Sequence, residues 1–381
     1  MLRLIRKIAI SLLVIYLALF GLTKFVRYPE PVAALRLAFA PASKTPNLMP
    51  GHWIVALPNT PTPWRIGTPE VPTQVTWDRT KITFDEFLAK TNTNAFVIVR
   101  NGKITYQKYL NGKTESTRLP SYSVAKTMTS IAIGQLIQAG KIKESDTFVS
   151  ILPRFKAGTD FDKVTIKDLL DMQGGIGVSD NYPTGPSGWG VAIAQMYAST
   201  DLNWFLDHNR KMKEVPGTFA EYRSVDTQLL GMIIQKITGQ LVADYFTSHV
   251  WQPIGAEFDA YWNVDHQGGQ EKTFCCFNAA ARDYARVGQL LLENGGGVIS
   301  ATWIKRLSTP TVTLDHNWGY SAQIWHPYPG VNMMLGLHGQ YVYVEPKTNT
   351  VIVKLSDEPT DNGNNEELTA AVLNEIALQQ H

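Results

Sequence analysis

Residues 96–109, in the sequence FVIVRNGKITYQKY, form two runs of β-branched and aromatic residues separated by polar ones, a pattern typical of strands. Asn101-Gly102 divides this run, and that dipeptide is a strong signal for a two-residue hairpin turn. Further runs rich in β-branched and aromatic residues follow in the C-terminal third, at 320–325, 333–344 and 350–355. The pattern predicts strands on both sides of the middle of the chain.

The middle of the chain has the period of helices. Residues 123–139 are apolar nearly all round, which predicts a helix buried in the centre of a domain. Thr165 and Asp168 have the spacing of a capping box at the start of a second helix. Helices are predicted at 123–139, 165–172, 227–238, 278–293 and 366–378.

This order of elements predicts an α/β protein of the α+β type. We expect an antiparallel β-sheet flanked by helices, with an all-α subdomain inserted in the middle. Catalytic groups are expected where the sheet and the inserted helices meet. Composition divides the chain into an N-terminal segment (1–28), a Pro-rich stalk or strap (29–80) and a catalytic domain (81–381).

The N-terminal segment has the composition of a membrane anchor. Sixteen uncharged, mostly apolar residues (8–23) follow a basic start and are closed by Lys24 and Arg27. Small residues at a cleavage position match poorly, so we favour an anchor over a cleaved export signal, and both over a buried core helix. The basic start places the N-terminus in the cytoplasm and the catalytic domain outside, as for a bacterial inner-membrane protein with a periplasmic domain.

Charge and metal-ligand spacing exclude several other classes. The formal net charge is +2, with no long run of one sign, so no nucleic-acid partner is expected. The eight histidines lack a metal-ligand spacing, and we expect no metal. Cys275 and Cys276 are adjacent, and we interpret them as two small buried hydrophobic residues; a vicinal disulfide is the alternative. The sequence does not predict the oligomeric state.

Ser123-Val124-Ala125-Lys126 begins the predicted central helix. Residues three apart on a helix share one face, about 5 to 6 Å between Cβ atoms, so the Lys126 amine can reach the Ser123 hydroxyl. Burial lowers the pKa of an amine and makes it a base for a hydroxyl nucleophile. The helix N-terminus adds N–H groups beside a developing oxyanion.

Tyr222-Arg223-Ser224 follows a Pro-Gly turn and precedes a predicted helix. A tyrosine beside Lys126 would be partly ionised or would relay a proton.

Residues 336–340, GLHGQ, lie inside a predicted apolar strand, and its two glycines indicate either a sheet bend or a close approach to the backbone. The N–H of Leu337 is a candidate partner for the Ser123 N–H in an oxyanion hole, with Gly336, His338 and Gly339 beside it.

These three elements, in this order and separation, resemble those of the serine β-lactamase and penicillin-binding superfamily, in its class C-like branch. The segments SYSVAKT, SDNY, EYRS and GLHGQYVYVEP also resemble the 6-aminohexanoate-dimer (nylon-oligomer) hydrolases. The resemblance covers residues 96–355. It implies a β-lactamase/transpeptidase-like fold, acylation of Ser123, proton exchange by Lys126 and Tyr222, contact of Tyr182 with the substrate amide, and no cofactor.

The Lys-Thr-Gly element that grips the carboxylate of β-lactams is absent, and residues 333–341 contain no Lys or Arg. Ser179-Asp180-Asn181 spells an element of class A β-lactamases, but Tyr182 extends it to the amidase pattern. We therefore expect a small amide or ester substrate. The alternatives are a peptidoglycan DD-peptidase or β-lactamase, and a non-catalytic sensor or scaffold.

Trp318, Tyr320 and Trp325 carry aromatic side chains at strand spacing. Such residues are core positions or walls of a substrate cleft.

Overall fold

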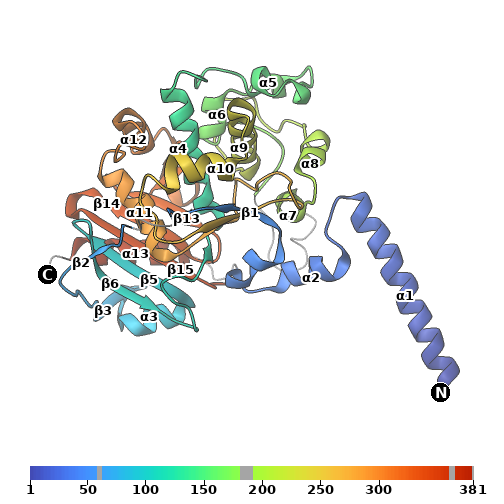
Figure 1. The fold of residues 1–381 in the computed structure, drawn as a ribbon, viewed down its shortest axis with the longest axis horizontal. Coiled ribbons are helices and arrows are strands. Elements are labelled where there is room, and N and C mark those ends of the chain that lie inside the picture. The colour runs from blue at the N-terminus through green and yellow to red at the C-terminus, as the bar shows by residue number, and fades with distance from the viewer. Residues whose placement is uncertain (58–61, 181–191, 360–364, 380–381) are drawn as a thin grey trace.

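The computed structural model describes residues 1–57, 62–180, 192–359 and 365–379 (Figure 1). A sheet-containing part and a helical part lie against each other, and the helix α1 (Leu2–Phe25) projects away from both. Mixed helices and antiparallel sheets confirm the predicted α+β class.

The main sheet has nine strands in the order β10-β11-β12-β13-β14-β15-β5-β6-β2, and every pairing is antiparallel except β2 with β6. Asn101 and Gly102 form the predicted turn between β5 and β6, both with positive φ. The strands are β10 (Val312–Thr313), β11 (Gly319–Ser321), β12 (Ile324–His326), β13 (Asn332–Gly336), β14 (Gln340–Glu345), β15 (Thr350–Ser356), β5 (Thr93–Arg100), β6 (Lys103–Tyr109) and β2 (Arg65–Ile66).

Both faces of this sheet are covered. Along β5, Val97 and Val99 point into the larger hydrophobic core, whereas Phe96 and Ile98 point into the second. Helix α11 (Ala281–Leu292) packs on the first face, and α13 (Asn365–Leu378) packs on the other. A strand buried on both faces carries apolar residues on both, which explains the uninterrupted apolar residues 95–99 of β5.

The helical part is built around α4 (Ala125–Gln138) and α9 (Ser224–Thr238), which pack against each other. Eleven of the fourteen α4 residues are buried, in agreement with its all-round apolar pattern. The Thr165–Asp168 capping box is present at the start of α6. The surrounding helices are α5 (Phe148–Ile151), α6 (Ile166–Leu170), α7 (Ala192–Ala198), α8 (Leu202–His208), α10 (Val242–Phe246) and α12 (Ala301–Leu307).

The Pro-rich segment lies on the domain. It forms α2 (Pro31–Phe39), the short helix η1 (Ala42–Leu48) and strand β1 (Gly51–Ile54). Strand β1 pairs with β8 (Ala260–Asn263), in a second sheet of order β1-β8-β9-β7 that includes β9 (Phe277–Ala279) and β7 (Leu119–Pro120). A small hairpin, β3 (Gln74–Trp77) and β4 (Thr80–Thr83), precedes α3 (Phe84–Lys90). The division at residues 28 and 80 stays a prediction.

Four local expectations are wrong. Residues 320–325 form two strands rather than one, because Ala322 and Gln323 turn the chain with positive φ. Residues 333–344 are the hairpin β13–β14. The helix predicted from residue 278 begins at Ala281, because residues 277–279 pair as β9. Cys275 and Cys276 form a vicinal disulfide rather than two free buried thiols.

Candidate active site

Ser123 lies at the entrance to the central helix. It belongs to the 3-10 turn η2 (Tyr122–Val124), which leads directly into α4. Tyr122 has a φ of 43°, a conformation that residues other than glycine rarely adopt. Contacts on several sides hold it there, among them the ring of His338, with centroids 4.8 Å apart, and the Thr45 hydroxyl at 3.5 Å. The turn presents Ser123 toward the junction of sheet and helices.

Lys126 is the buried amine of this junction. Its side chain is 1% exposed, and its Nζ donates to Ser123 Oγ at 3.0 Å, Ser224 Oγ at 2.8 Å and the Phe274 carbonyl at 3.0 Å. Burial lowers the pKa of Lys126 to about 8, and the carboxyl of Asp180 opposes this shift. A substantial fraction of the amine is therefore neutral at slightly alkaline pH.

The partners of Lys126 determine where its lone pair points. A carbonyl oxygen only accepts, so Phe274 takes one N–H. Ser224 Oγ donates its own proton to Asp180 Oδ2 at 2.5 Å, so it also accepts from Lys126. A neutral amine has two N–H groups, and both are then occupied. Its lone pair is left facing Ser123 Oγ, as a base for the Ser123 hydroxyl requires.

Tyr222 lies across the Lys126 amine, with Nζ 4.8 Å from the centre of the phenol ring. Its ring stacks on Trp325 at 5.4 Å and meets Tyr320 edge to face at 6.1 Å. Burial raises the pKa of Tyr222 well above its ordinary value, although a hydrogen bond with Ser123 opposes the shift. Of the two roles expected for Tyr222, partial ionisation is contradicted by this shift, whereas a proton relay by the neutral phenol stays a prediction.

Asp180 is a site residue that sequence reasoning did not assign. It accepts from the Ser224 backbone N–H at 2.7 Å as well as from its hydroxyl. Ser224 begins α9, so the carboxyl lies at the positive end of that helix. Asp180 was interpreted only as part of a β-lactamase-like tripeptide, and nothing in the sequence links it to a residue forty-four positions away.

The turn between β13 and β14 lies against the Ser123 segment. A Cβ on Gly336 would overlap the Ser121 carbonyl oxygen and would lie 3.1 Å from the Ser123 amide nitrogen, so a side chain has no room there. This contact places the backbone of Gly336, the residue before Leu337, against the Ser123 segment. The glycines thus mark both a close approach and a turn, in which His338 and Gly339 have positive φ.

His338 does not supply a cation at this turn. Its Nδ1 lies 2.8 Å from the Glu358 carbonyl oxygen, which only accepts, so Nδ1 carries a proton. Burial lowers the pKa of His338 below its ordinary value. The ring is therefore neutral at pH 7.

The disulfide lies directly after the carbonyl that binds Lys126. Cys275 and Cys276 follow Phe274, and both are buried. Trp262 Nε1 donates to the Cys275 carbonyl at 3.0 Å and fixes the same loop from its other side. The loop therefore positions one of the three partners of Lys126.

Two further expectations were a contact of Tyr182 with the substrate and the lack of a metal site. Tyr182 lies outside the described residues. Within the ranges that the structure describes, no group of three or more His, Cys, Asp or Glu side chains could hold a metal ion.

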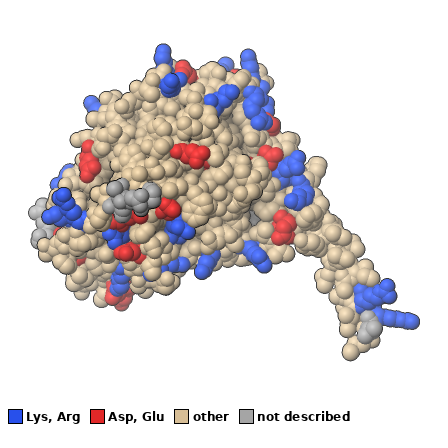
Figure 2. All heavy atoms as spheres, viewed as in Figure 1, with Lys and Arg blue, Asp and Glu red and all other residues tan. Residues whose placement is uncertain are grey.

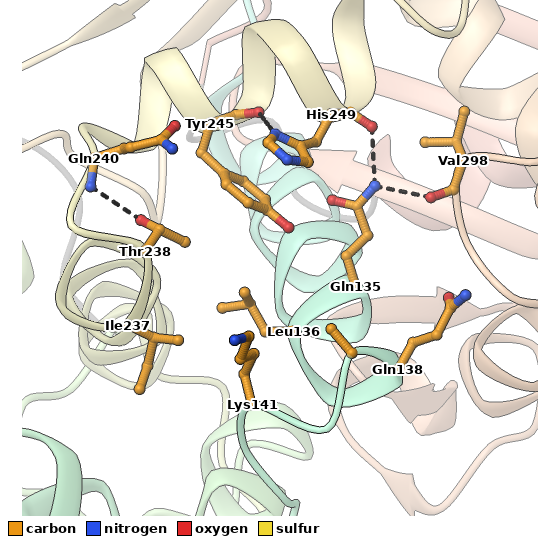
Figure 3. Close-up of a pocket in the computed structure, with 11 residues that line it drawn as sticks. Gln135, Leu136, Gln138, Lys141, Ile237, Thr238, Gln240, Tyr245, His249 and Val298 are labelled. Carbon is orange, nitrogen blue, oxygen red and sulfur yellow. Dashed lines mark hydrogen bonds between the residues drawn. The ribbon is translucent and has the colours of Figure 1, made fainter.

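A cavity of about 570 Å³ lies elsewhere (Figure 3). It is lined by the C-terminal end of α4, including Gln135, and by the stacked rings of Tyr245 and His249. Ser123 lies twelve residues before Gln135, about 18 Å along the helix. This cavity is therefore separate from the Ser123 cluster.

The fold and this cluster define a class of protein. A family model described as "Beta-lactamase" matches residues 83–376. The chain belongs to the Beta-lactamase family, a family of serine hydrolases.

Individual relatives narrow the comparison. The chain is 27% identical over 300 residues to the 6-aminohexanoate-dimer hydrolase of Paenarthrobacter ureafaciens, covering 72% of this chain and 75% of the relative. The structure of a putative 6-aminohexanoate-dimer hydrolase from Bacillus anthracis is similar, with a TM-score of 0.78, 25% identity, and 92% and 94% of the two chains covered. A family VIII carboxylesterase shares the fold at 18% identity and a TM-score of 0.60, covering 76% of this chain and 94% of its own.

Proposed function

We propose that the protein hydrolyses a small amide or ester through an acyl-enzyme on Ser123. One observation carries this proposal: both N–H groups of a neutral Lys126 have acceptors other than Ser123, so its lone pair faces the Ser123 hydroxyl. The named activity of its relatives, hydrolysis of the 6-aminohexanoate dimer, supports an amide as one substrate class.

In the first half of the reaction, Lys126 takes the Ser123 proton while Oγ attacks the substrate carbonyl carbon. The N–H groups of Ser123 and Leu337 stabilise the oxyanion. When the tetrahedral intermediate collapses, the bond to the leaving amine or alcohol breaks. The proton returns to that group from Lys126, relayed by the neutral phenol of Tyr222.

In the second half, water attacks the acyl carbon and loses a proton to Lys126. Collapse releases the acid and returns the proton to Ser123 Oγ. Asp180 and Ser224 act as positioning residues, because they orient Lys126 without touching the substrate in this scheme.

The test is covalent labelling of purified protein with a fluorophosphonate, read by intact mass. We expect Ser123→Ala to lose both the adduct and turnover of esters and amides. Ser130→Ala is the matched control: Ser130 lies in α4, the helix that follows Ser123, is buried, and its hydroxyl has no partner among the described atoms. An adduct that persists in Ser123→Ala, with the far-UV circular dichroism unchanged, would overturn the assignment.

We also propose that α1 anchors the enzyme in a membrane, with the catalytic domain on the extracytoplasmic side. Residues 3–25 have a mean hydropathy of 2.2 over the best window, and none of that window is buried in the protein. Figure 2 shows basic side chains at the free end of α1 and an uncharged surface along the helix. Extraction by carbonate and by detergent distinguishes an embedded helix from a cleaved signal.

A further inference from the structure

Arg223 is a buried cation between two residues of the candidate site, Tyr222 and Ser224. Its side chain is 1% exposed. The guanidinium donates to the Ile176 carbonyl at 2.5 Å and, more weakly, to the Val178 carbonyl at 3.5 Å. A buried charge needs partners, and two of the partners here are neutral backbone carbonyls. The guanidinium therefore fixes the backbone at residues 176 and 178.

The carboxylate beside Arg223 is shared with another cation. Glu221 Oε2 accepts from Arg223 at 2.6 Å and from Lys213 Nζ at 2.7 Å. One carboxylate therefore faces two cations, and a net positive charge remains at this side of the site. A guanidinium is not deprotonated in proteins, so the charge of Arg223 is present over the whole pH range of an assay.

The segment that Arg223 holds leads to Asp180. Alternate residues of 172–180 contact residues 221–226, at and just before the start of α9. These residues are Met172, Gly174, Ile176, Val178 and Asp180. Val178 lies two residues before Asp180, at most about 7 Å along the chain. Fixing the Val178 carbonyl therefore limits where the Asp180 carboxyl can lie relative to Ser224.

Charge also couples Arg223 to Asp180. Burial raises the pKa of the Asp180 carboxyl. The cation of Lys126 opposes this shift most, followed by the hydrogen bonds from Ser224 and by the cation of Arg223. When Lys126 acts as a base it is neutral, so its own effect on the carboxyl is lost. Arg223 then remains as a permanent cation that favours the carboxylate.

Three other titratable groups that face Asp180 are neutral. Burial raises the pKa of Asp226 well above its ordinary value, so that carboxyl is protonated. Burial likewise raises the pKa of both Tyr222 and Tyr320 well above the ordinary value of a phenol. These three groups therefore do not replace the charge of Arg223.

We infer that Arg223 is a positioning residue for Asp180. It holds the backbone at residues 176–178 so that the Asp180 carboxyl reaches Ser224. It also keeps that carboxyl ionised while Lys126 is neutral. This inference rests on the proposed function, in which Asp180 and Ser224 orient the Lys126 base.

The test is kcat/KM against pH, with an ester that does not itself titrate. The variants are Arg223→Gln, Arg223→Lys, Asp180→Asn and the double variant of Arg223→Gln with Asp180→Asn. Gln keeps a hydrogen-bond donor but has no charge, whereas Lys keeps the charge but lacks the planar fork that binds two carbonyls. Far-UV circular dichroism and the thermal midpoint report on folding.

Arg100→Gln is the matched control. Arg100 also pairs with one carboxylate, that of Glu70, and it donates to the backbone carbonyls of Ile376 and Ala377. It lies opposite Thr350 in the sheet, at the other end of the strands from the 336–340 turn. We expect Arg100→Gln to lower the thermal midpoint and to leave the pH dependence unchanged.

Without the Arg223 charge, Asp180 should become protonated and should no longer stabilise the ammonium form of Lys126. In Arg223→Gln the rise of kcat/KM, which follows the Lys126 pKa of about 8, should therefore move by about one unit to lower pH. Its plateau should fall by about tenfold, because Ser224 is held less firmly. The double variant should rise at the pH of Asp180→Asn alone. Arg223→Lys should restore the original pH of the rise but not the full plateau.

A lower thermal midpoint in Arg223→Gln, with the rise at its original pH, would make Arg223 a purely structural residue and overturn the inference. A rise displaced to higher pH would show that Arg223 acts on Lys126 directly, and would also overturn it. If Arg223→Gln does not fold, Arg223→Lys decides: a rise displaced as far as in Asp180→Asn would exclude the role of the charge, and an unchanged plateau would exclude the positioning. An undisplaced rise in Asp180→Asn itself would instead reject Lys126 as the base.

Discussion

Replacing Asp180 by Asn tests whether the Lys126 amine is the base. The two groups are joined through Ser224 by hydrogen bonds of 2.8 Å and 2.5 Å, so their charges lie about 5 Å apart. With an effective dielectric constant of about 20, that separation corresponds to about 3 kcal/mol, or about two pKa units. Burial raises the pKa of Asp180, and the protonated fraction of the carboxyl carries no charge. We therefore expect Asp180→Asn to change the pKa of Lys126 by about one to two units.

The direction of the effect follows from the charges. The Asp180 carboxylate stabilises the ammonium form of Lys126, so its removal lowers the pKa of Lys126 further below about 8. A base works only when it is deprotonated, and kcat/KM of the unmodified enzyme should therefore rise with pH through about 8. In Asp180→Asn the same rise should occur at lower pH.

The assay is kcat/KM against pH with an ester that does not itself titrate. Asp85→Asn is the control, because Asp85 is an exposed carboxylate that pairs with Lys108 far from the site. A rise that stays at the same pH in Asp180→Asn, or that moves upward, would refute the coupling and the assignment of Lys126 as the base.

Three further outcomes are expected. Lys126→Ala and Tyr222→Phe should each lower kcat by about 10² to 10⁴, and the double variant should lose far less than the product, since both serve one proton path; fully additive losses would show independent roles. An uncharged ester should have a kcat/KM at least about tenfold above that of benzylpenicillin, because His338 is neutral and offers no cation to a carboxylate; equal rates would favour a β-lactamase. Reducing the Cys275–Cys276 disulfide with a phosphine, or replacing both cysteines by Ala, should lower kcat by about tenfold and leave KM nearly unchanged, because the Phe274 carbonyl that accepts from Lys126 would be held less firmly. An unaltered kcat in the double variant would show that the loop holds its shape without the disulfide.

Sequence periodicity predicted elements whose signals are local. The turn at Asn101-Gly102 has such a signal, since this dipeptide readily takes the positive φ that its hairpin needs. Helix α4 was predicted because a helix buried on all sides is apolar all round.

Elements that depend on distant pairing were predicted less well. Residues 277–279 form β9 only because β7 and β8 lie on either side of it. The turn at Ala322 and Gln323 has no glycine to reveal it. By contrast, Gly339 is a glycine in a three-residue hairpin loop, and that signal was available but was interpreted as an interruption within one strand.

The candidate site shows the same difference between local signals and contacts that depend on the fold. Ser123 and Lys126 share a helix, so their contact follows from spacing, whereas Tyr222 was found through the resemblance of its motif. Asp180 and the Phe274 carbonyl come from loops that only the fold brings to Lys126. A backbone carbonyl has no residue type at all, so a sequence motif cannot report it.

The unusual backbone of Tyr122 has a consequence for where the enzyme begins. Thr45 of η1 is one of the residues that hold Tyr122, and through it the Ser123 turn, yet the family match starts only at residue 83. A truncated enzyme that starts at that boundary would lack η1, and the nucleophile turn could relax from its positive φ. We therefore expect the shortest chain that retains full turnover to reach back at least to Ala42, well before the segment that the family model matches.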